Sequence, residues 1–256
     1  MKHFIPALHH ATLCMGAGGR IIKSALPNAE VGTTFSCSHI EPFRNNEKDI
    51  LAAGKIDALL NRLFIEPVLG LGYPSDELKP LKNIDKYFQP SDEKLLAFDF
   101  DFIGVQNYTR EVVKRSFFTP YIGASIVKAS ERKVERTLMN WEVYPESMYH
   151  ILKKFAAYPQ IKKLIVTENG AAFPDLLKEG KVIDDKRVDY LKRYTAQVLR
   201  AKEEGVNVQG YFIWTLTDNF EWAEGFHPRF GIIYVNFETQ ERIIKSSGEW
   251  YREFLS

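Results

Sequence analysis

One segment constrains the fold of this chain more than any other: residues 164–170, which read LIVTENG. The short apolar run predicts a buried strand over residues 161–167, and the Asn-Gly pair predicts a tight turn after it. Glu168 therefore stands at the carboxyl end of a buried strand. Barrels of parallel strands carry catalytic groups at that position, although Glu-Asn-Gly alone also fits an exposed turn.

A second segment repeats the pattern: residues 211–222, which read YFIWTLTDNFEW. Another apolar run again ends in aromatic side chains and a carboxylate. Two strands that end in this way favour a shared site over two unrelated turns, because the carboxyl ends of neighbouring parallel strands meet at one edge of the sheet.

The rest of the chain alternates strands with helices. Strands are predicted at 31–37, 98–105, 161–167 and 208–214, helices at 49–63, 145–158 and 186–204, a hairpin at 232–244 and a short helix at the C-terminus. Residues 111–139 are predicted to form a long loop or hairpin. In the first of these helices the predicted apolar stripe comprises Ile50, Ala53, Ile56, Leu59, Leu60 and Leu63. This alternation predicts an α/β fold with a parallel sheet covered by helices, and four strand–helix units are counted where a closed barrel has eight.

The two segments resemble glycoside hydrolase family 1, the β-glucosidase family, whose members fold as (β/α)8 TIM barrels. Residues 167–170 match the Thr-Glu-Asn-Gly motif of the family, which implies that Glu168 is the nucleophile. Residues 102–109 resemble the end of the preceding barrel strand, where the family places a Tyr that holds the nucleophile; here it is Tyr108. The family has Asn two residues before that Tyr, and this chain has Gln106, which keeps the amide on a longer arm.

Residues 214–231 resemble the segment with which the family binds its sugar. The resemblance implies that Trp214, Glu221, Trp222 and Phe230 hold the substrate. An aromatic ring beside a carboxylate suits a pyranose, because the ring stacks on C–H faces and the carboxylate accepts hydroxyl hydrogen bonds. The alternative is a group of core aromatics at a strand end. Phospho-glycosidases of the family have Ser in place of Glu221, so a neutral β-glycoside is expected, a β-glucoside first.

Further segments, around residues 141–146, 187–191 and 245–250, also resemble the family, but the motif of its acid/base, Asn-Glu-Pro, is absent from this sequence. The implied fold is therefore a partial barrel: residues 1–256 form a single C-terminal half with about strands 5–8, and the N-terminal half is missing. The implied enzyme is a retaining β-glycosidase with a covalent glycosyl-enzyme on Glu168. Alternatives are a catalytically impaired sugar-binding remnant or one subunit of a split barrel. Partners would be an N-terminal half-barrel chain or a second copy.

Composition narrows the function further. With 34 basic and 33 acidic residues, the formal net charge is +1, and no basic tract predicts binding to nucleic acid or to a membrane surface. No spacing of His, Cys or carboxylates predicts a metal site, and the implied reaction needs no cofactor. With 45% hydrophobic residues the chain supports one core. No signal peptide or membrane span is evident, which predicts a cytoplasmic protein.

Overall fold

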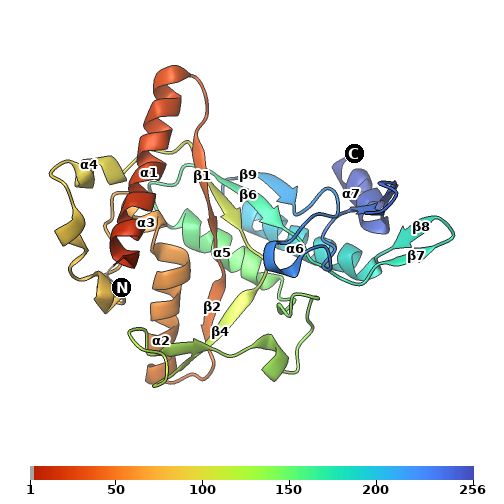
Figure 1. Cartoon of the computed structure of the whole chain (residues 1–256), viewed down its shortest axis with the longest axis horizontal. Coiled ribbons are helices and arrows are strands. Elements are labelled where there is room, and N and C mark those ends of the chain that lie inside the picture. The colour runs from red at the N-terminus through yellow and green to blue at the C-terminus, as the bar shows by residue number, and fades with distance from the viewer. Residues whose placement is uncertain (1–2) are drawn as a thin grey trace.

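A computed structural model describes residues 3–256, and a sheet of four parallel strands lies at its centre (Figure 1). The strands are β1 (Gly32–Ser36), β3 (Phe102–Gln106), β6 (Leu164–Asn169) and β9 (Val208–Ile213). They pair in chain order, so β3 and β6 are central and β1 and β9 form the edges. The four predicted strands are thus confirmed. Two begin later than expected, because residues 98–101 and 161–163 precede the ladder.

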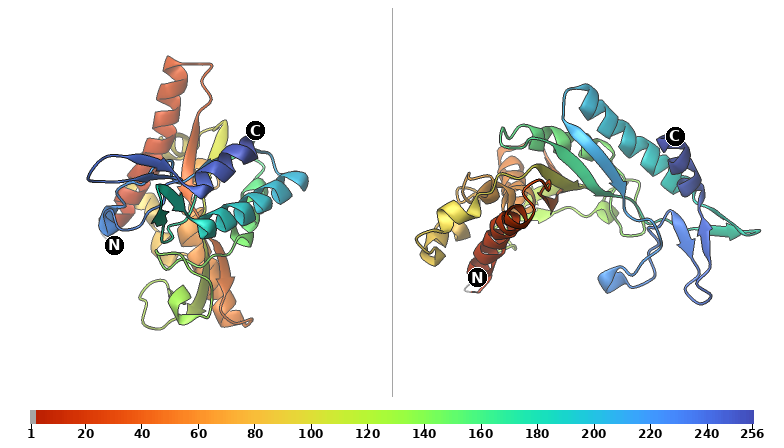
Figure 2. Two further views of the ribbon diagram at one scale, coloured as in Figure 1. Left: turned by 90° about the vertical axis from the view of Figure 1, so that its right-hand side faces the viewer. Right: turned by 90° about the horizontal axis from the view of Figure 1, so that it is seen from above.

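Two helices, α5 (Glu146–Ala156) and α6 (Asp185–Glu203), cover one side of the main sheet (Figure 2). The α-helices are α1 (Phe4–Ala25), α2 (Glu47–Asp57), α3 (Ile65–Val68), α4 (Asp92–Leu96), α5 (Glu146–Ala156), α6 (Asp185–Glu203) and α7 (Ser246–Leu255). One π-helical turn, η1 (Ala58–Arg62), continues α2. Short 3₁₀ turns lie at Lys79–Leu81, Ile84–Tyr87, Ala129–Glu131 and Trp222–Glu224.

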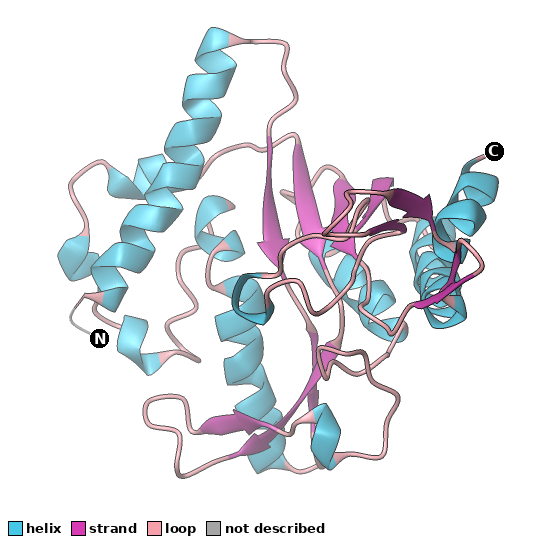
Figure 3. Cartoon of the chain, turned by 45° about the vertical axis from the view of Figure 1, so that its right-hand side comes forward, coloured by secondary structure: helices cyan, strands magenta, loops and turns pink. Residues whose placement is uncertain are grey.

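Three smaller sheets extend from the carboxyl side of the main one (Figure 3). One comprises β2 (His39–Pro42), β4 (Arg110–Arg115) and β5 (Ala124–Ile126), in the order β2-β4-β5. The other two are hairpins: β7 (Leu176–Lys178) with β8 (Lys181–Ile183), and β10 (Ile233–Val235) with β11 (Arg242–Ile244). The last hairpin confirms the prediction for 232–244.

The two faces of the main sheet differ. Phe35, Val105 and Val166 turn toward α5 and α6 and belong to the largest buried cluster, to which both helices contribute. Successive strand residues point to opposite faces, so Thr34 lies on the other side, where it is exposed. On that side too, Phe212 is 60% exposed. The buried core therefore lies between the main sheet and helices α5 and α6. The opposite face of the sheet, which carries Thr34 and Phe212, is open.

The predicted apolar stripe of residues 49–63 is partly wrong. Ala53 and Ile56 are buried as expected, but Ile50 and Leu60 are exposed. The buried face of α2 also includes Asp49, whose carboxylate accepts hydrogen bonds from Arg44 Nε and from the backbone N–H of Arg115. That polar contact fixes how α2 is turned against β4, and apolar spacing alone does not reveal it.

Candidate active site

Glu168 lies at the carboxyl end of the central strand β6, and neighbouring side chains hold both of its carboxylate oxygens. Tyr108 donates its hydroxyl to Oε2 at 2.6 Å, and Gln106 donates Nε2 to Oε1 at 2.8 Å. Burial, and then the hydrogen bond to Glu168, raise the pKa of Tyr108 well above its usual range, so its hydroxyl stays a donor. The structure thus brings together three of the predicted site residues.

The backbone at Tyr108 is fixed from helix α6. Its carbonyl accepts hydrogen bonds from the hydroxyls of Tyr190, at 3.1 Å, and Tyr194, at 3.0 Å. The two rings stack with centroids 4.0 Å apart, because positions i and i+4 are neighbours on one face of a helix. Both rings are fully buried, and each hydroxyl has a partner, as buried polar groups require.

Asn169 joins this support to strand β9. Its side-chain Nδ2 donates to the carbonyl of Asn107 at 2.7 Å and to the Tyr190 hydroxyl at 3.0 Å, and its Oδ1 accepts from the Tyr211 hydroxyl at 2.6 Å. The residue is completely buried. Its side chain therefore holds the ends of three neighbouring strands around Glu168, a role that no sequence pattern assigns to it.

Trp214 and Glu221 meet across the segment that follows β9. The indole Nε1 donates to Glu221 Oε1 at 2.9 Å, and Asn219 Nδ2 donates to the same oxygen at 2.8 Å. Gly170 allows this segment to approach β6, because a Cβ there would stand 1.8 Å from the carbonyl oxygen of Trp214. The Trp214 N–H also donates to the carbonyl of Asn169 at 2.9 Å, so residues 169–170 and Trp214 are held in direct contact.

Two other predicted site residues lie in opposite environments. The Trp222 side chain is 88% exposed, whereas Phe230 is 1% exposed. The Phe230 ring packs against Tyr108 and Trp141, with centroids 6.5 and 6.0 Å away. Phe230 thus forms the back of an aromatic wall whose front carries Tyr108 and Trp141, and it presents no open face of its own.

The site places a carboxylate with hydrogen bonds to both oxygens beside a polar surface, an arrangement that can support a reactive carboxylate next to a bound ligand. Hydrogen-bond donors on both oxygens of Glu168 fix the orientation of its carboxyl group. An indole and a second carboxylate lie on the adjoining segment, and aromatic rings line the base. Within residues 3–256, no group of three or more His, Cys, Asp and Glu side chains is arranged to hold a metal ion. Over the same residues, no helix is both long and apolar enough to cross a membrane.

Strands, helices and site together define an α/β-barrel type of protein with carboxylates at the strand ends, and comparison with known proteins assigns its family. The model of glycosyl hydrolase family 1 matches residues 1–256, and the chain belongs to this family. Beta-glucosidase A of Acetivibrio thermocellus is 38% identical over 255 residues, which cover 96% of this chain and 56% of that protein. The 1,4-beta-D-glucan glucohydrolase of Thermotoga neapolitana is 38% identical over 260 residues, covering 100% and 58%.

Solved structures agree on the fold. The family 1 β-glucosidase from Thermotoga maritima superposes with a TM-score of 0.91 at 36% sequence identity, covering 97% of this chain and 56% of that one. The four-stranded sheet is therefore part of a TIM barrel, as predicted. The chain spans a little over half the length of the relatives that it matches.

Proposed function

We propose that Glu168 is the nucleophile of a retaining β-glycosidase site, and that residues 1–256 form the C-terminal half of that site. The observation that carries the proposal is the Glu168 carboxylate at the end of β6, with one oxygen held by Tyr108 and the other by Gln106. These donors hold the carboxylate in one orientation, which attack on an anomeric carbon requires.

The proposed substrate is a neutral β-glycoside, most simply a β-glucoside. Trp214 and Trp222 offer aromatic surface, and Glu221 accepts the sugar hydroxyls farthest from the anomeric carbon. Glu221 Oε1 already accepts bonds from Trp214 and Asn219, which leaves its other oxygen for the sugar. The names of the relatives, β-glucosidases and a glucan glucohydrolase, support the same substrate class.

The proposed reaction has two steps. A Glu168 oxygen bonds to the anomeric carbon while the bond from that carbon to the aglycone oxygen breaks, and the aglycone leaves with a proton from a general acid. Water then attacks the same carbon, Glu168 leaves as a carboxylate, and the group that gave the proton takes one from the water. That acid/base requires a second carboxyl group roughly 5–5.5 Å from the nucleophile.

The acid/base is proposed to come from polypeptide outside residues 1–256. Supporting this, the sequence contains no Asn-Glu-Pro, and the main sheet has open edges at β1 and β9. An N-terminal half-barrel, on the same or another polypeptide, would supply both strands and acid. A second copy would close the sheet but bring only another Glu168, and in that case the chain would be a sugar-binding form with impaired catalysis. The cytoplasmic location stays a prediction.

A reagent that needs little acid assistance tests Glu168 directly. With 2-deoxy-2-fluoro-β-D-glucosyl fluoride, the leaving group is good and the fluorine slows hydrolysis of the intermediate. We expect intact-protein mass spectrometry to show one added fluoroglucosyl group, peptide mapping to place it on Glu168, and Glu168→Gln to remain unlabelled. Labelling elsewhere, or of Glu168→Gln equally, would contradict the proposal.

Hydrolysis separates the alternatives for the acid/base. We expect the chain alone to hydrolyse p-nitrophenyl β-D-glucoside about 10²–10⁴-fold more slowly than complete relatives, which is the usual cost of losing one acid/base group. Addition of the N-terminal half of a relative should raise this rate if the halves associate. A rate equal to that of complete relatives, with no added half, would show that the acid/base lies within this chain.

A further inference from the structure

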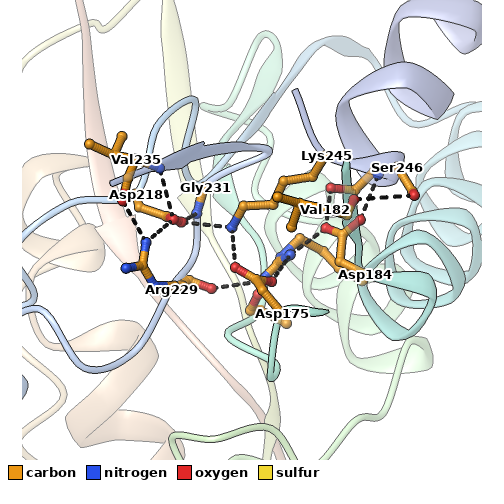
Figure 4. Close-up of polar contacts among 12 residues, drawn as sticks. Asp175, Val182, Asp184, Asp218, Arg229, Gly231, Val235, Lys245 and Ser246 are labelled. Carbon is orange, nitrogen blue, oxygen red and sulfur yellow. Dashed lines mark hydrogen bonds and ion pairs between the residues drawn. The ribbon is translucent and has the colours of Figure 1, made fainter. Parts of the chain in front are cut away.

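A network of charged side chains, most of them buried, lies behind the site, between the segment that follows Glu168 and the segment that carries Glu221 (Figure 4). It contains three carboxylates and three cations: Asp175, Asp184, Asp218, Arg187, Arg229 and Lys245. The formal charges cancel. Removing such groups from water is costly unless each one is paired. The positions of these side chains are therefore constrained, because a shift of one would leave another without its partner.

Lys245 is the member that joins the two segments most directly. Its ammonium donates to Asp175 Oδ2 and to Asp218 Oδ1, both at 2.7 Å, and its side chain is fully buried. Asp175 lies seven positions after Glu168, and Asp218 lies three before Glu221. Figure 4 shows the Lys245 side chain between the two carboxylates. One cation thus spans from the nucleophile segment to the segment of the sugar-binding carboxylate.

Asp218 is held from every other side as well. Arg229 Nη1 donates to Oδ2 at 2.6 Å, and the backbone N–H groups of Gly231 and Val235 donate to the two oxygens at 3.0 and 3.3 Å. The position of Asp218 is therefore set by its partners. Glu221 lies only three residues after Asp218. The position of Asp218 therefore limits where the Glu221 side chain can lie.

Arg187 makes a second connection in parallel. Its Nε donates to the carbonyl of Ala171 at 3.0 Å, and its Nη2 donates to the carbonyl of Arg229 at 2.6 Å. The same guanidinium pairs with Asp175 at 3.0 Å and with Asp184. Arg187 also donates hydrogen bonds to backbone carbonyls of both segments, so its removal would disturb more than one contact. The hydrogen bonds of the Lys245 ammonium go to the two carboxylates, one in each segment, so Lys245 is the better residue to change.

We propose that Lys245 is a positioning residue that sets the distance between Glu168 and Glu221, and thereby the preference for sugars that carry a hydroxymethyl group. The inference rests on the proposed function of those two residues. A hexose is long enough to reach Glu221 with its distal hydroxyls, whereas a pentose lacks the outermost one. Discrimination between them therefore depends on how far Glu221 stands from the reacting carbon.

The test compares two labelling reagents, the 2-deoxy-2-fluoro-β-D-glucosyl and the 2-deoxy-2-fluoro-β-D-xylosyl fluoride. We expect the intact chain to react at least about tenfold faster with the glucosyl reagent, because an unmet polar group penalises the shorter sugar. Lys245→Met and Glu221→Gln should each lower that ratio at least about fivefold, and the double variant should lower it no further, because residues that act through one contact are not additive. Equal slowing with both reagents in Lys245→Met would reduce Lys245 to a structural brace and overturn the proposal.

Lys154→Met is the control for loss of a lysine–aspartate ion pair at a more exposed position, since this side chain is 32% exposed. It removes another lysine whose ammonium lies 2.7 Å from both oxygens of an aspartate, Asp57, in a different part of the chain. We expect it to leave the ratio unchanged. If Lys245→Met fails to fold, Asp175→Asn replaces it, since the amide keeps size and an acceptor but removes the charge on one side. The ratio should fall in this variant too, and an unchanged ratio overturns the proposal.

Hydrogen exchange distinguishes failure of this inference from failure of the proposed function. If neither reagent labels the intact chain, the function of Glu168 is wrong, and the exchange of the Asp218 and Gly231 amides still reports on Lys245. These amides donate to Ile233 O and to Asp218 Oδ1. Exchange about tenfold faster in Lys245→Met than in Lys154→Met would show that Lys245 holds the Asp218 segment in place, which the positioning role requires, because local opening frees these donors. Equal exchange in both variants overturns it.

Discussion

The nucleophile cradle, formed by Gln106, Tyr108 and Glu168, and the clamp segment, residues 214–231, differ in how completely the chain supports them. The cradle is supported from beneath by buried side chains of α6 and β9, and each carboxylate oxygen of Glu168 has a donor. The clamp segment is anchored at Asp218 but exposes Leu216, Phe220, Trp222 and Phe226, each by more than half. The cradle finds all of its hydrogen-bond partners within the chain. The clamp segment instead presents apolar side chains that a substrate or a partner half-barrel would cover.

Under the proposed function, this difference assigns a separate part of the reaction to each region. A charged nucleophile must be fixed before the sugar arrives, because donors aimed in advance require no reorganisation during reaction. A surface that stacks on a sugar can stay exposed until the substrate or a partner half covers it, because covering its apolar area then contributes to binding. We therefore expect substitutions in the cradle to change rate, and substitutions of the exposed aromatic side chains of the clamp segment to change affinity while leaving the fold unchanged.

Tyr108→Phe should have the largest effect. It removes the 2.6 Å hydrogen bond to Glu168 and keeps the ring that packs against Trp141 and Phe230. We expect labelling by the fluoroglucosyl fluoride to slow about 10²–10³-fold, the usual cost of one preorganised donor. Tyr149→Phe removes a similar bond, 2.7 Å long, to Glu204 on the surface and should not change the rate. Equal rates in the two variants would mean that Tyr108 does not hold the nucleophile.

Gly170→Ala should break the contact between the two regions. A Cβ at this position would lie 1.8 Å from the Trp214 carbonyl oxygen, so the backbone must move apart. We expect a loss of about 1–3 kcal/mol in the free energy of unfolding, measured by urea denaturation. Gly54→Ala in α2, where a Cβ meets nothing within 4 Å, should instead stabilise by about 0.5–1 kcal/mol. Similar changes in both variants would show that the approach at Gly170 is not tight.

The sequence predicts the main sheet and the cradle well because both leave local signals. Continuous apolar runs identify β1, β3, β6 and β9, and residues 167–170 identify Glu168. Strand β2, reading HIEP, was missed because it is short and polar and pairs with β4 from a distant part of the chain. Strand β4 falls almost entirely within residues 111–139, predicted as a long loop or hairpin, and it does form a hairpin with β5.

The supporting polar contacts could not be predicted for a related reason. Tyr190 and Tyr194 lie on the buried stripe of α6, but the stripe does not say that their hydroxyls reach the carbonyl of Tyr108, more than 80 positions away. Lys245 likewise finds partners 70 and 27 positions distant. Periodicity predicts which face of a helix is buried, whereas polar partners are set by tertiary packing. The exposure of Trp222 and the burial of Phe230 depend on that packing too.

Trp222→Ala tests the expectation for the clamp segment. The side chain is 88% exposed, so its removal should change the free energy of unfolding by less than about 0.5 kcal/mol. The apparent dissociation constant of the fluoroglucosyl fluoride, obtained from the concentration dependence of labelling, should rise about fivefold, the worth of a modest aromatic contact. Phe118→Ala, which removes an aromatic side chain that is 97% exposed, should change neither quantity. A large loss of stability in Trp222→Ala would place this ring in the fold.

The smallest expected effect concerns pH and the polar strand β2 next to the cradle. Burial, and then the neighbouring His150 ring, lower the pKa of His39, although Glu41 favours its charged form. The two imidazole rings stack with centroids 4.2 Å apart. Below the ordinary pKa of about 6.5 the unfolded chain therefore takes up this proton before the folded chain does, so stability falls as pH decreases from there toward the lowered pKa.

His39→Gln should flatten that fall. Between pH 7.5 and 5.5, urea denaturation of the unaltered chain should show a decline to which this residue contributes at most about 1.4 kcal/mol per pH unit, and the variant should lack that share. His10→Gln, at an exposed position of α1, serves as the control and should keep the full decline. A steeper decline in His39→Gln than in the unaltered chain would reverse the sign of the argument, since it would mean that Glu41 outweighs burial and His150 in setting the charge of His39.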